Sequence, residues 1–373
     1  MTHAVLALNA GSSTLKFSIF RFHAGTETEL GAGNLEVNDG NDAALLERVL
    51  AEAERLAGAP PDAVGHRIVH GGEQFTAPVR VDEHVLARLA TLSDLAPLHL
   101  PPALALLRKA LERLPRVPHV ACFDTAFHHG LPEVARRFAL PSALYERGIH
   151  RYGFHGLSCE YVLSALGSPP PRRLIIAHLG SGASLTAVLD GRSIDTSMGL
   201  TPAGGIAMGT RSGDLDPGIL LHLLRERTHT VDELTELIHH DSGLKGVTGD
   251  SSMSKLLARA EHGDAPAKMG IELFAYGVKK QIGAYMAALG GLDCLVFTAG
   301  IGEHSPLVRA LALEGLSWSG IELDVEANHA GASVISRKSS RVVVRVLPTN
   351  EDLVIARAAR AVLPTAPHGS AIR

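Results

Sequence analysis

Hydrophobic runs separated by glycine-rich turns predict two similar β-hairpins in this chain. The first run, residues 4–20, is interrupted by small residues at positions 9–13, which is typical of two strands joined by a tight turn. Residues 174–189 repeat this pattern around the sequence Gly-Ser-Gly. Gly11 aligns with Gly180 at an offset of 169 residues, and the flanking strands then superpose. The repeat indicates an internal duplication that produces two related halves.

Apolar residues at helical spacing alternate with further apolar runs between and after these hairpins. Together they predict an α/β protein. Further apolar runs predict strands that begin near residues 63, 118, 293 and 341. Residues 246–255 and 299–304 are expected to form loops, and Thr349 is expected to cap the last helix. The predicted helices span residues 42–57, 82–92, 103–114, 157–166, 218–225, 231–238, 265–289 and 351–363.

Arg67 and Asp124 are charged residues on otherwise apolar strands and are candidates for ligand contact. Arg67 lies on a strand that ends in Gly71-Gly72, and a buried charge there is costly unless it meets an anion. A structural salt bridge is as good an interpretation of Arg67 as a ligand contact. Asp124 ends an apolar run, at the edge where open α/β sheets bind ligands, although it can equally cap a helix.

Glycine-rich segments in the second half indicate sites for an anion. Arg211 lies among glycines beside Asp214 and Asp216, which favours a charge directed at a bound ligand over a solvated surface arginine. Gly300 and Gly302 follow a strand and precede a helix, where backbone N–H groups can hold a phosphate. The chain has no P-loop sequence and no protein-kinase motif set.

Composition narrows the function classes. The chain has 373 residues, 46% of them hydrophobic and 20% charged, which is typical of a globular protein large enough for two domains. A formal net charge of -4 gives no electrostatic reason to expect a nucleic-acid or membrane partner. Cys122, Cys159 and Cys294 are widely spaced and predict neither disulfides nor a zinc site, so we expect a cytoplasmic protein.

Motifs along nearly the whole chain resemble those of the acetate kinase family. In chain order they are NAGSSTLK, GHRIVHGGE, APLH, FDTAFH, RYGFHG, HLGSGAS, DTSMGLTPAGGIAMGTRSGDLDP, FTAGIGEHS and TNE. The resemblance implies two ribonuclease-H-like lobes around a central cleft, which agrees with the duplication. It places the N-terminal lobe at residues 1–148 plus 352–373, with a returning C-terminal helix. The nucleotide-binding lobe would then span residues 149–351, and the protein would be a homodimer.

The resemblance also implies phosphoryl transfer from ATP to acetate with Mg²⁺ or Mn²⁺, and it assigns residue roles. The catalytic positions are Asn9, Arg67, Asp124, His155 and Arg211, and the metal positions are Asn9 and Glu351. The substrate positions are Arg67, Val69, Leu98, Phe154 and Pro202. The nucleotide positions are Ser12, Lys16, His178, Leu179, Gly180, Ser181, Gly182, Met253, Ser254, Lys255, Gly300, Ile301, Gly302, Glu303 and His304.

Two alternatives to this interpretation stay open. One is a kinase for propionate or another short-chain carboxylate, because one methylene changes binding in an apolar pocket by only about 1–3 kcal/mol. The other is a non-kinase ATPase of the same superfamily. The phosphoryl donor is a separate question, since residues 253–255 read Met-Ser-Lys where the family commonly has an aspartate, a methionine or phenylalanine, and an arginine.

Overall fold

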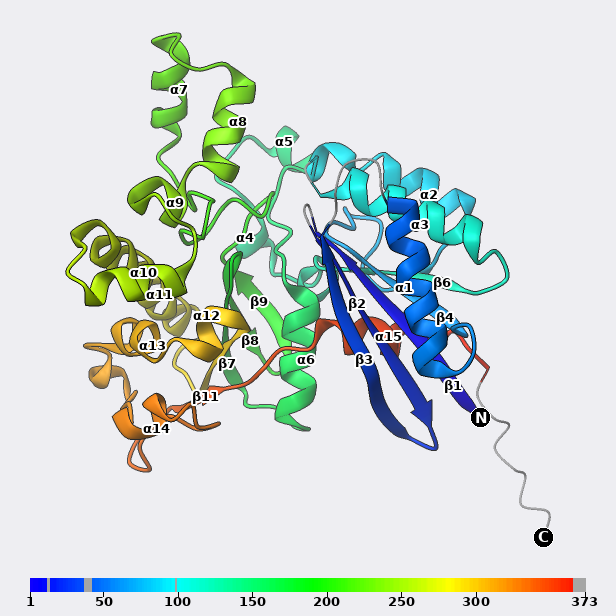
Figure 1. Cartoon of the computed structure of the whole chain (residues 1–373). Coiled ribbons are helices and arrows are strands. Elements are labelled where there is room, and N and C mark those ends of the chain that lie inside the picture. The colour runs from blue at the N-terminus through cyan, green and yellow to red at the C-terminus, as the bar shows by residue number, and fades with distance from the viewer. Residues whose placement is uncertain (12–13, 37–41, 98, 365–373) are drawn as a thin grey trace. The chain divides into compact units, whose positions relative to one another are not determined.

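The computed structural model describes residues 1–11, 14–36, 42–97 and 99–364. The chain forms two compact units, which we call unit 1 (Met1–Phe127 with Asn350–Arg373) and unit 2 (His128–Thr349) (Figure 1). Each unit contains one mixed β-sheet with helices packed on it, so the predicted α/β class with a duplicated sheet is confirmed. No helix among the described residues is both long and apolar enough to span a bilayer.

The sheet of unit 1 has six strands. Their order is β3 (Thr26–Glu36), β2 (Thr14–His23), β1 (Thr2–Ala10), β4 (Ala63–Ile68), β6 (His119–Phe123) and β5 (Val79–Arg80). Strands β1, β2 and β3 form an antiparallel meander, and β4 and β6 run parallel to β1. The carboxyl ends of β1, β4 and β6 therefore lie at the same edge of the sheet.

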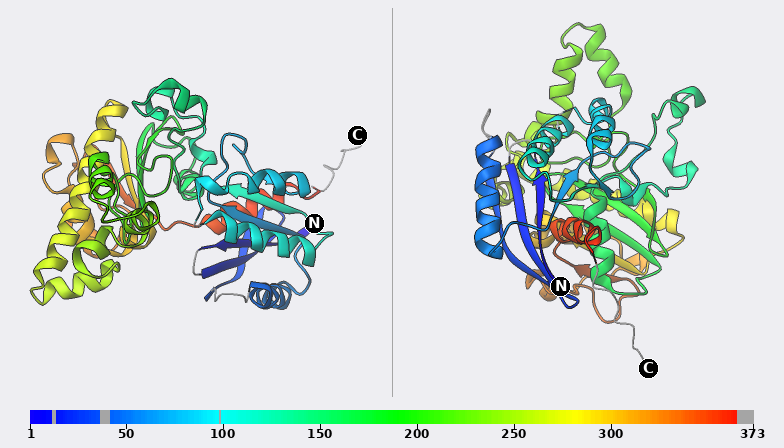
Figure 2. Two further views of the ribbon diagram at one scale, coloured as in Figure 1. Left: turned by 90° about the horizontal axis from the view of Figure 1, so that it is seen from above. Right: turned by 90° about the vertical axis from the view of Figure 1, so that its right-hand side faces the viewer.

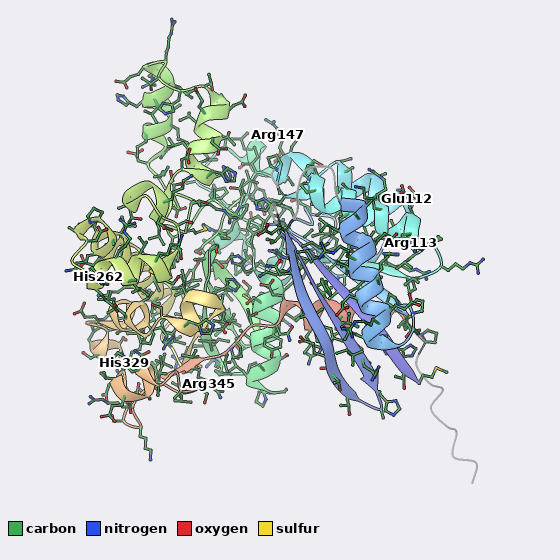
Figure 3. All side chains as sticks on the ribbon, in the orientation of Figure 1. Glu112, Arg113, Arg147, His262, His329 and Arg345 are labelled. Atoms are coloured by element: carbon green, nitrogen blue, oxygen red, sulfur yellow. The ribbon has the colours of Figure 1, made fainter. Side chains whose placement is uncertain are left out.

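Among the described residues, five helical segments belong wholly to unit 1. They are α1 (Asp42–Ala57), α2 (Glu83–Ala90), η1 (Ser93–Leu95), α3 (Leu100–Arg113) and α15 (Glu351–Ala361), and η2 (Ala126–His128) crosses the boundary between the units. Figure 3 labels Arg113 at the end of α3, whose Nε donates to Glu47 Oε1 of α1 at 2.6 Å. This exposed ion pair joins two helices that contribute side chains to the same hydrophobic core.

Helices cover both faces of the unit 1 sheet (Figure 2). On one face, Val64 of β4 packs in a core with Leu45 of α1 and Leu106 of α3. The next residue, Gly65, points to the opposite face, where an added Cβ would lie 2.4 Å from Ile355 of α15. The absence of a side chain at Gly65 is what lets the C-terminal helix approach β4 so closely.

Unit 2 repeats the strand arrangement of unit 1. Its order is β11 (Val343–Val346), β10 (Cys294–Thr298), β7 (Arg173–Leu179), β8 (Ala183–Leu189) and β9 (Arg192–Thr196). Here β7, β8 and β9 are antiparallel, while β10 and β11 run parallel to β7. The order β3-β2-β1-β4-β6 therefore recurs as β9-β8-β7-β10-β11. The equivalent strands β2 and β8 even carry irregularities at neighbouring positions, at Ile19/Phe20 and Ala187/Val188.

The helices of unit 2 pack on this sheet and extend beyond it. Helix α6 contacts β7, α11 contacts β7 and β8, and α12 contacts β7 and β10. The segments are α4 (Glu133–Arg136), α5 (Ser142–Glu146), α6 (Gly156–Leu166), α7 (Pro217–Arg225), α8 (Val231–His240), α9 (Gly243–Thr248), α10 (Met253–Glu261), α11 (Ala265–Leu289), α12 (Ala299–His304), α13 (Pro306–Leu313), η3 (Ser317–Ser319) and α14 (Val325–His329).

Three local predictions were wrong. The segment 246–255, expected as a loop, contains the end of α9 and the first turn of α10. The segment 299–304 is the short helix α12, which begins directly after β10. The last helix is capped by Asn350, whose side chain accepts from the N–H of Leu353, and not by Thr349. In the first two cases glycine hid the helical periodicity.

Candidate functional site

In unit 1, the parallel strands bring Asn9, Arg67 and Asp124 together. Asn9 lies near the end of β1, Arg67 on β4, and Asp124 directly after β6. Arg67 Nε is 3.1 Å from both carboxylate oxygens of Asp124, Arg67 Nη2 donates to Asp124 Oδ2, and Arg67 Nη1 donates to Asn9 Oδ1 at 3.0 Å. The arginine therefore has the partner anion that its position on an apolar strand required.

The charge of Arg67 is permanent in this setting. Burial acts to lower the pKa of its guanidinium, but the charges of Asp124 and Glu351 and the hydrogen bonds to Asp124 outweigh it, so the pKa is raised. The Asp124 side chain is 1% exposed, whereas that of Arg67 is 19% exposed. These contacts use one N–H on each guanidinium nitrogen, which leaves a second N–H on Nη1 and on Nη2 for an anion.

The predicted metal residues supply oxygen atoms in unit 1. Asn9 is half-buried, and Glu351 is the half-buried first residue of α15. The neighbouring Asp352 accepts a hydrogen bond from Ser18. The described residues contain no cluster of three His, Cys, Asp or Glu side chains that could enclose an ion. An amide and one carboxylate fit Mg²⁺, which usually keeps several waters and binds through one or two carboxylates plus substrate phosphates.

In unit 2, His155 and His178 form a stacked pair. Their ring centroids are 4.1 Å apart with an interplanar angle of 18°, and both residues are buried. The Nδ1 atom of His155 is 2.9 Å from Ser184 Oγ, and that of His178 is 2.8 Å from Ser158 Oγ. His155 has a left-handed backbone with φ of 59° at the N-cap of α6, a conformation that sequence patterns did not indicate.

Arg211 and His155 converge on the turn between β7 and β8. A Cβ added at Gly182 would lie 3.3 Å from His155 Nε2 and 3.4 Å from Arg211 Nη1. Arg211 Nη1 also donates to the carbonyl of Pro202 at 3.2 Å. A side chain at position 182 would therefore occupy the space that these two donors face. The turn residues 180–182 separate β7 from β8, as the sequence predicted.

Sequence reasoning missed His128, which supports the loop that carries His155. Its ring nitrogens lie 2.9 Å from Ser193 Oγ and 2.9 Å from the carbonyl oxygen of Phe154. Burial lowers the pKa of His128 to about 4, although the hydrogen bond with Phe154 acts to raise it. Gly153 has no room for a side chain, because a Cβ would lie 2.8 Å from the His128 ring. The available signal was the histidine that ends the FDTAFH motif.

The nucleotide candidates of unit 2 lie on several elements. His178 and Leu179 end β7, Gly180, Ser181 and Gly182 form the following turn, and residues 300–304 belong to α12. Met253, Ser254 and Lys255 form the first turn of α10, where the exposed Lys255 lies 3.6 Å from Asp250.

The buried Arg309 holds α12 in place. Its Nη1 donates to the carbonyl oxygens of Gly302 and Glu303 at 2.8 Å each, and its Nε donates to Asn328 Oδ1. Arg309 was not predicted either, because a single arginine inside an amphipathic helix carries no distinguishing signal.

The predicted set is divided between the two units. Asn9, Lys16, Arg67, Val69, Asp124 and Glu351 belong to unit 1, and Phe154, His155, Pro202, Arg211 and the remaining nucleotide candidates belong to unit 2. Val69 and Phe154 are each buried within their own unit. Ser12 and Leu98 lie outside the described residues, so their predicted roles stay predictions.

The strand order shared by the two sheets defines this chain as a duplicated α/β protein with the fold of solved carboxylate kinases. A profile of the acetokinase family matches residues 43–357. An acetate kinase from Leifsonia xyli subsp. xyli is 45% identical over 95% of this chain and 98% of its own length. The chain belongs to the acetokinase family, whose members are kinases that transfer a phosphoryl group to a carboxylate.

Solved structures give the same assignment. A propionate kinase from Francisella tularensis subsp. tularensis SCHU S4 is 35% identical, with a TM-score of 0.87 over 97% of this chain and 100% of its own. The acetate kinase from Porphyromonas gingivalis is 34% identical, with a TM-score of 0.85 over the same shares. Both likenesses extend across both units of the chain.

Proposed function

We propose that this protein catalyses reversible phosphoryl transfer from ATP to acetate, which produces acetyl phosphate and ADP. The observation that carries the proposal is Arg67, held by Asp124 and Asn9 with further N–H donors left for an anion. Phosphoryl transfer requires such fixed cationic donors, because charge on the equatorial oxygens must be stabilised and little other chemistry is needed from the protein.

The residue roles follow from the acceptor's chemistry. Acetate is already ionised at pH 7, so it needs no general base before it attacks the γ-phosphoryl group. What it needs is relief of repulsion between two anions, and Arg67 and Arg211 supply planar, permanently charged donors for this. His155 would donate a hydrogen bond to the phosphoryl group in transfer. Asp124 would orient Arg67 and take no proton itself.

Asn9 and Glu351 would hold Mg²⁺, or Mn²⁺ in its place, in part through water. When bound with the nucleotide, the ion would neutralise charge on the phosphate oxygens. The amide of Asn9 already accepts a hydrogen bond from Arg67. The hydrogen bond between Arg67 and Asn9 would thus fix the position of the metal ligand relative to the cationic donor.

Acetate is the acceptor we favour, and propionate is the second candidate. Val69, Phe154 and Pro202, with Leu98 outside the described residues, are the positions proposed to contact the acyl group. The propionate kinase from F. tularensis is a relative of this chain and has the same fold. Since a methylene changes binding by about 1–3 kcal/mol, a shallow preference for acetate is expected.

The adenosine contact would involve the first turn of α10. This turn lacks the aspartate and the arginine that the family commonly has at positions 253 and 255. Its Lys255 lies beside Asp250 instead. We propose ATP as the donor on the strength of family membership, with the turn 180–182 and helix α12 holding its phosphates.

A homodimer and a cytoplasmic location complete the proposal. Helix α7 has no buried residue, although five of its nine residues are Ile or Leu, and exposed Ile219, Leu221 and Leu224 suit contact with a second copy. Cys122, Cys159 and Cys294 are buried thiols outside any disulfide, which suits a reducing compartment. Sedimentation velocity tests the first point, and a mass of 39.4 kDa would refute the dimer.

A hydroxylamine trap tests the proposed reaction. The protein is incubated with Mg-ATP, hydroxylamine and matched concentrations of acetate, propionate or butyrate, and the acyl hydroxamate is measured. We expect product with acetate and less with each longer acid. A higher rate with propionate would select the second candidate. If ATP gives no product, the assay is repeated with GTP and pyrophosphate, and failure of all donors would refute kinase activity.

A further inference from the structure

Ser158 connects two residues that are far apart in the chain. It lies in the first turn of α6 and is fully buried. Its Oγ lies 2.8 Å from His178 Nδ1 and accepts a hydrogen bond from Thr349 Oγ1 at 2.9 Å. The backbone N–H of Thr349 donates to Glu303 Oε1 at 3.3 Å. The Ser158 hydroxyl group, at the start of α6, thus joins His178 at the end of β7 to Thr349, the last residue of unit 2.

The direction of these hydrogen bonds selects the protonation pattern of His178. A serine hydroxyl carries a single proton, and Thr349 already donates to Ser158, so the Ser158 proton is directed to His178 Nδ1. A neutral imidazole that accepts at Nδ1 carries its own proton on Nε2. The Nε2 atom lies 3.9 Å from the position of a Cβ at Gly180. His178 therefore presents an N–H to the turn between β7 and β8.

His155 presents its Nε2 to the same turn. Its ring stacks on His178 at 4.1 Å, its Nδ1 is occupied by Ser184, and its Nε2 lies 3.3 Å from the Cβ position of Gly182. Two cationic rings in this stacked contact would repel each other. A His178 ring that accepts at Nδ1 is neutral and therefore avoids this repulsion.

We propose that Ser158 and Thr349 are positioning residues for this histidine pair. The relay Thr349–Ser158–His178 holds His178 as an Nε2–H donor and fixes the ring on which His155 stacks. It also ties that ring to the point where the chain leaves unit 2, two residues before Glu351. The inference rests on the proposed kinase function. It adds that one chain of hydrogen bonds positions both His155 and Thr349, the residue at which the chain leaves unit 2.

Removal of single hydroxyl groups tests the relay. Thr349→Val and Ser158→Ala should each lower kcat about tenfold, as loss of an orienting partner does elsewhere. The double variant should be no slower than the slower single variant, because both changes interrupt one chain of hydrogen bonds. Thr349→Ser keeps the hydroxyl and should restore kcat, which a purely structural role for the threonine methyl group would not allow.

Thr186→Val is the matched control. Thr186 is also a buried β-strand threonine, and its hydroxyl lies 3.2 Å from Thr196 Oγ1 and accepts from Cys159, but it is not linked to either histidine by these bonds. Its replacement should lower the melting temperature and leave kcat near the wild-type value. Losses in the double variant that multiply, or a wild-type kcat in Thr349→Val, would refute the relay.

Nitrogen NMR gives a readout that does not depend on turnover. In protein labelled with ¹⁵N-histidine, the His178 signals are assigned by their absence from His178→Gln. Wild-type protein should show a protonated Nε2 and an unprotonated Nδ1, and Ser158→Ala should show a mixture of tautomers. A proton on Nδ1 in the wild type refutes the relay even if the protein proves active. The expected spectrum in a protein that makes no acyl phosphate would support the relay and refute the proposed function.

Discussion

Arg67 gives the most direct residue-scale test, because it contacts Asp124 through two guanidinium nitrogens. Arg67→Lys keeps a cation beside the buried carboxylate but cannot reproduce the planar, two-nitrogen contact. We expect kcat for acetyl hydroxamate formation to fall about 10²–10³-fold, the typical cost of removing one preorganised donor. A kcat within a few-fold of the wild type, measured under saturating substrates, would contradict the assignment.

The matched variants separate charge from geometry. Arg67→Met leaves Asp124, whose side chain is 1% exposed, without its cation, which should destabilise the fold by about 3–5 kcal/mol in urea unfolding. Arg113→Lys changes an exposed arginine that pairs with the equally exposed Glu47, and it should leave kcat and stability unchanged.

His128 predicts a pH dependence of stability. Its folded-state pKa of about 4 lies below the ordinary value of 6.5, so the unfolded chain binds more protons between these values. The stabilisation is fully present above pH 6.5 and is lost as the pH falls toward 4. This one group contributes a slope of about 1.4 kcal/mol per pH unit within that window. His66 and His119, a buried pair whose pKa values are also lowered by burial, add a slope of the same sign.

His128→Gln isolates this contribution. A glutamine amide can still donate to the Phe154 carbonyl but does not titrate, so unfolding free energies between about pH 4 and 7 should vary less steeply than in the wild type. Equal slopes for both proteins would assign the acid sensitivity to other groups.

At the scale of elements, the contact between β4 and α15 depends on a missing side chain. A Cβ at Gly65 would lie 2.4 Å from Ile355 Cγ2 and 2.9 Å from the Ile355 carbonyl oxygen. Backbone cannot move aside as a side chain can, so Gly65→Ala should destabilise the protein by about 1–3 kcal/mol. Gly283 lies inside α11 with open space around an added Cβ, and Gly283→Ala should instead stabilise by about 0.5–1 kcal/mol. Urea unfolding that shows the same sign for both would contradict this account.

Sequence patterns predicted the regular elements well and the irregular ones poorly. Helix α11 spans the predicted residues, and β1 and β2 lie on either side of the predicted turn, because each has a continuous period of apolar positions. Helix α12 escaped prediction because Gly300 and Gly302 interrupt that period, and tertiary contacts such as those from Arg309 hold it instead. The Arg67–Asp124 salt bridge, one of the two open interpretations of Arg67, is present because β4 and β6 are parallel neighbours, and the ligand contact stays a prediction.

Residues such as Ser158 and His128 could not be found from local patterns. Their partners lie 191 and 65 positions away in sequence, at Thr349 and Ser193. A serine in the first turn of a helix is too common to be informative alone. Such contacts follow from the packing of a whole unit, which periodicity does not encode.

At the scale of the whole molecule, unit 1 is built from two separate stretches of chain. Helix α15 follows unit 2 in sequence but packs against β1, β2, β4 and β6, and it buries Val354, Ile355, Ala356 and Ala359. Burying one Val or Ile side chain stabilises by about 1.5–3 kcal/mol, so the helix supplies much of the roughly 5–15 kcal/mol typical of a domain. The domain boundaries expected near residues 148 and 351 stay a prediction that truncation can test.

A chain that ends at Thr349 should therefore lose the fold of unit 1 and keep that of unit 2. Loss of α15 exposes the face of the sheet around Gly65 and removes the Arg357–Glu27 ion pair and the Ser18–Asp352 hydrogen bond. Limited proteolysis with mass spectrometry should show rapid cleavage within residues 1–127 and protection of residues 128–349. The matched control ends at Pro364, which retains all of α15, and should resist cleavage in both regions. Equal protection of residues 1–127 in the two truncations would mean that the sheet of unit 1 is stable without its returning helix.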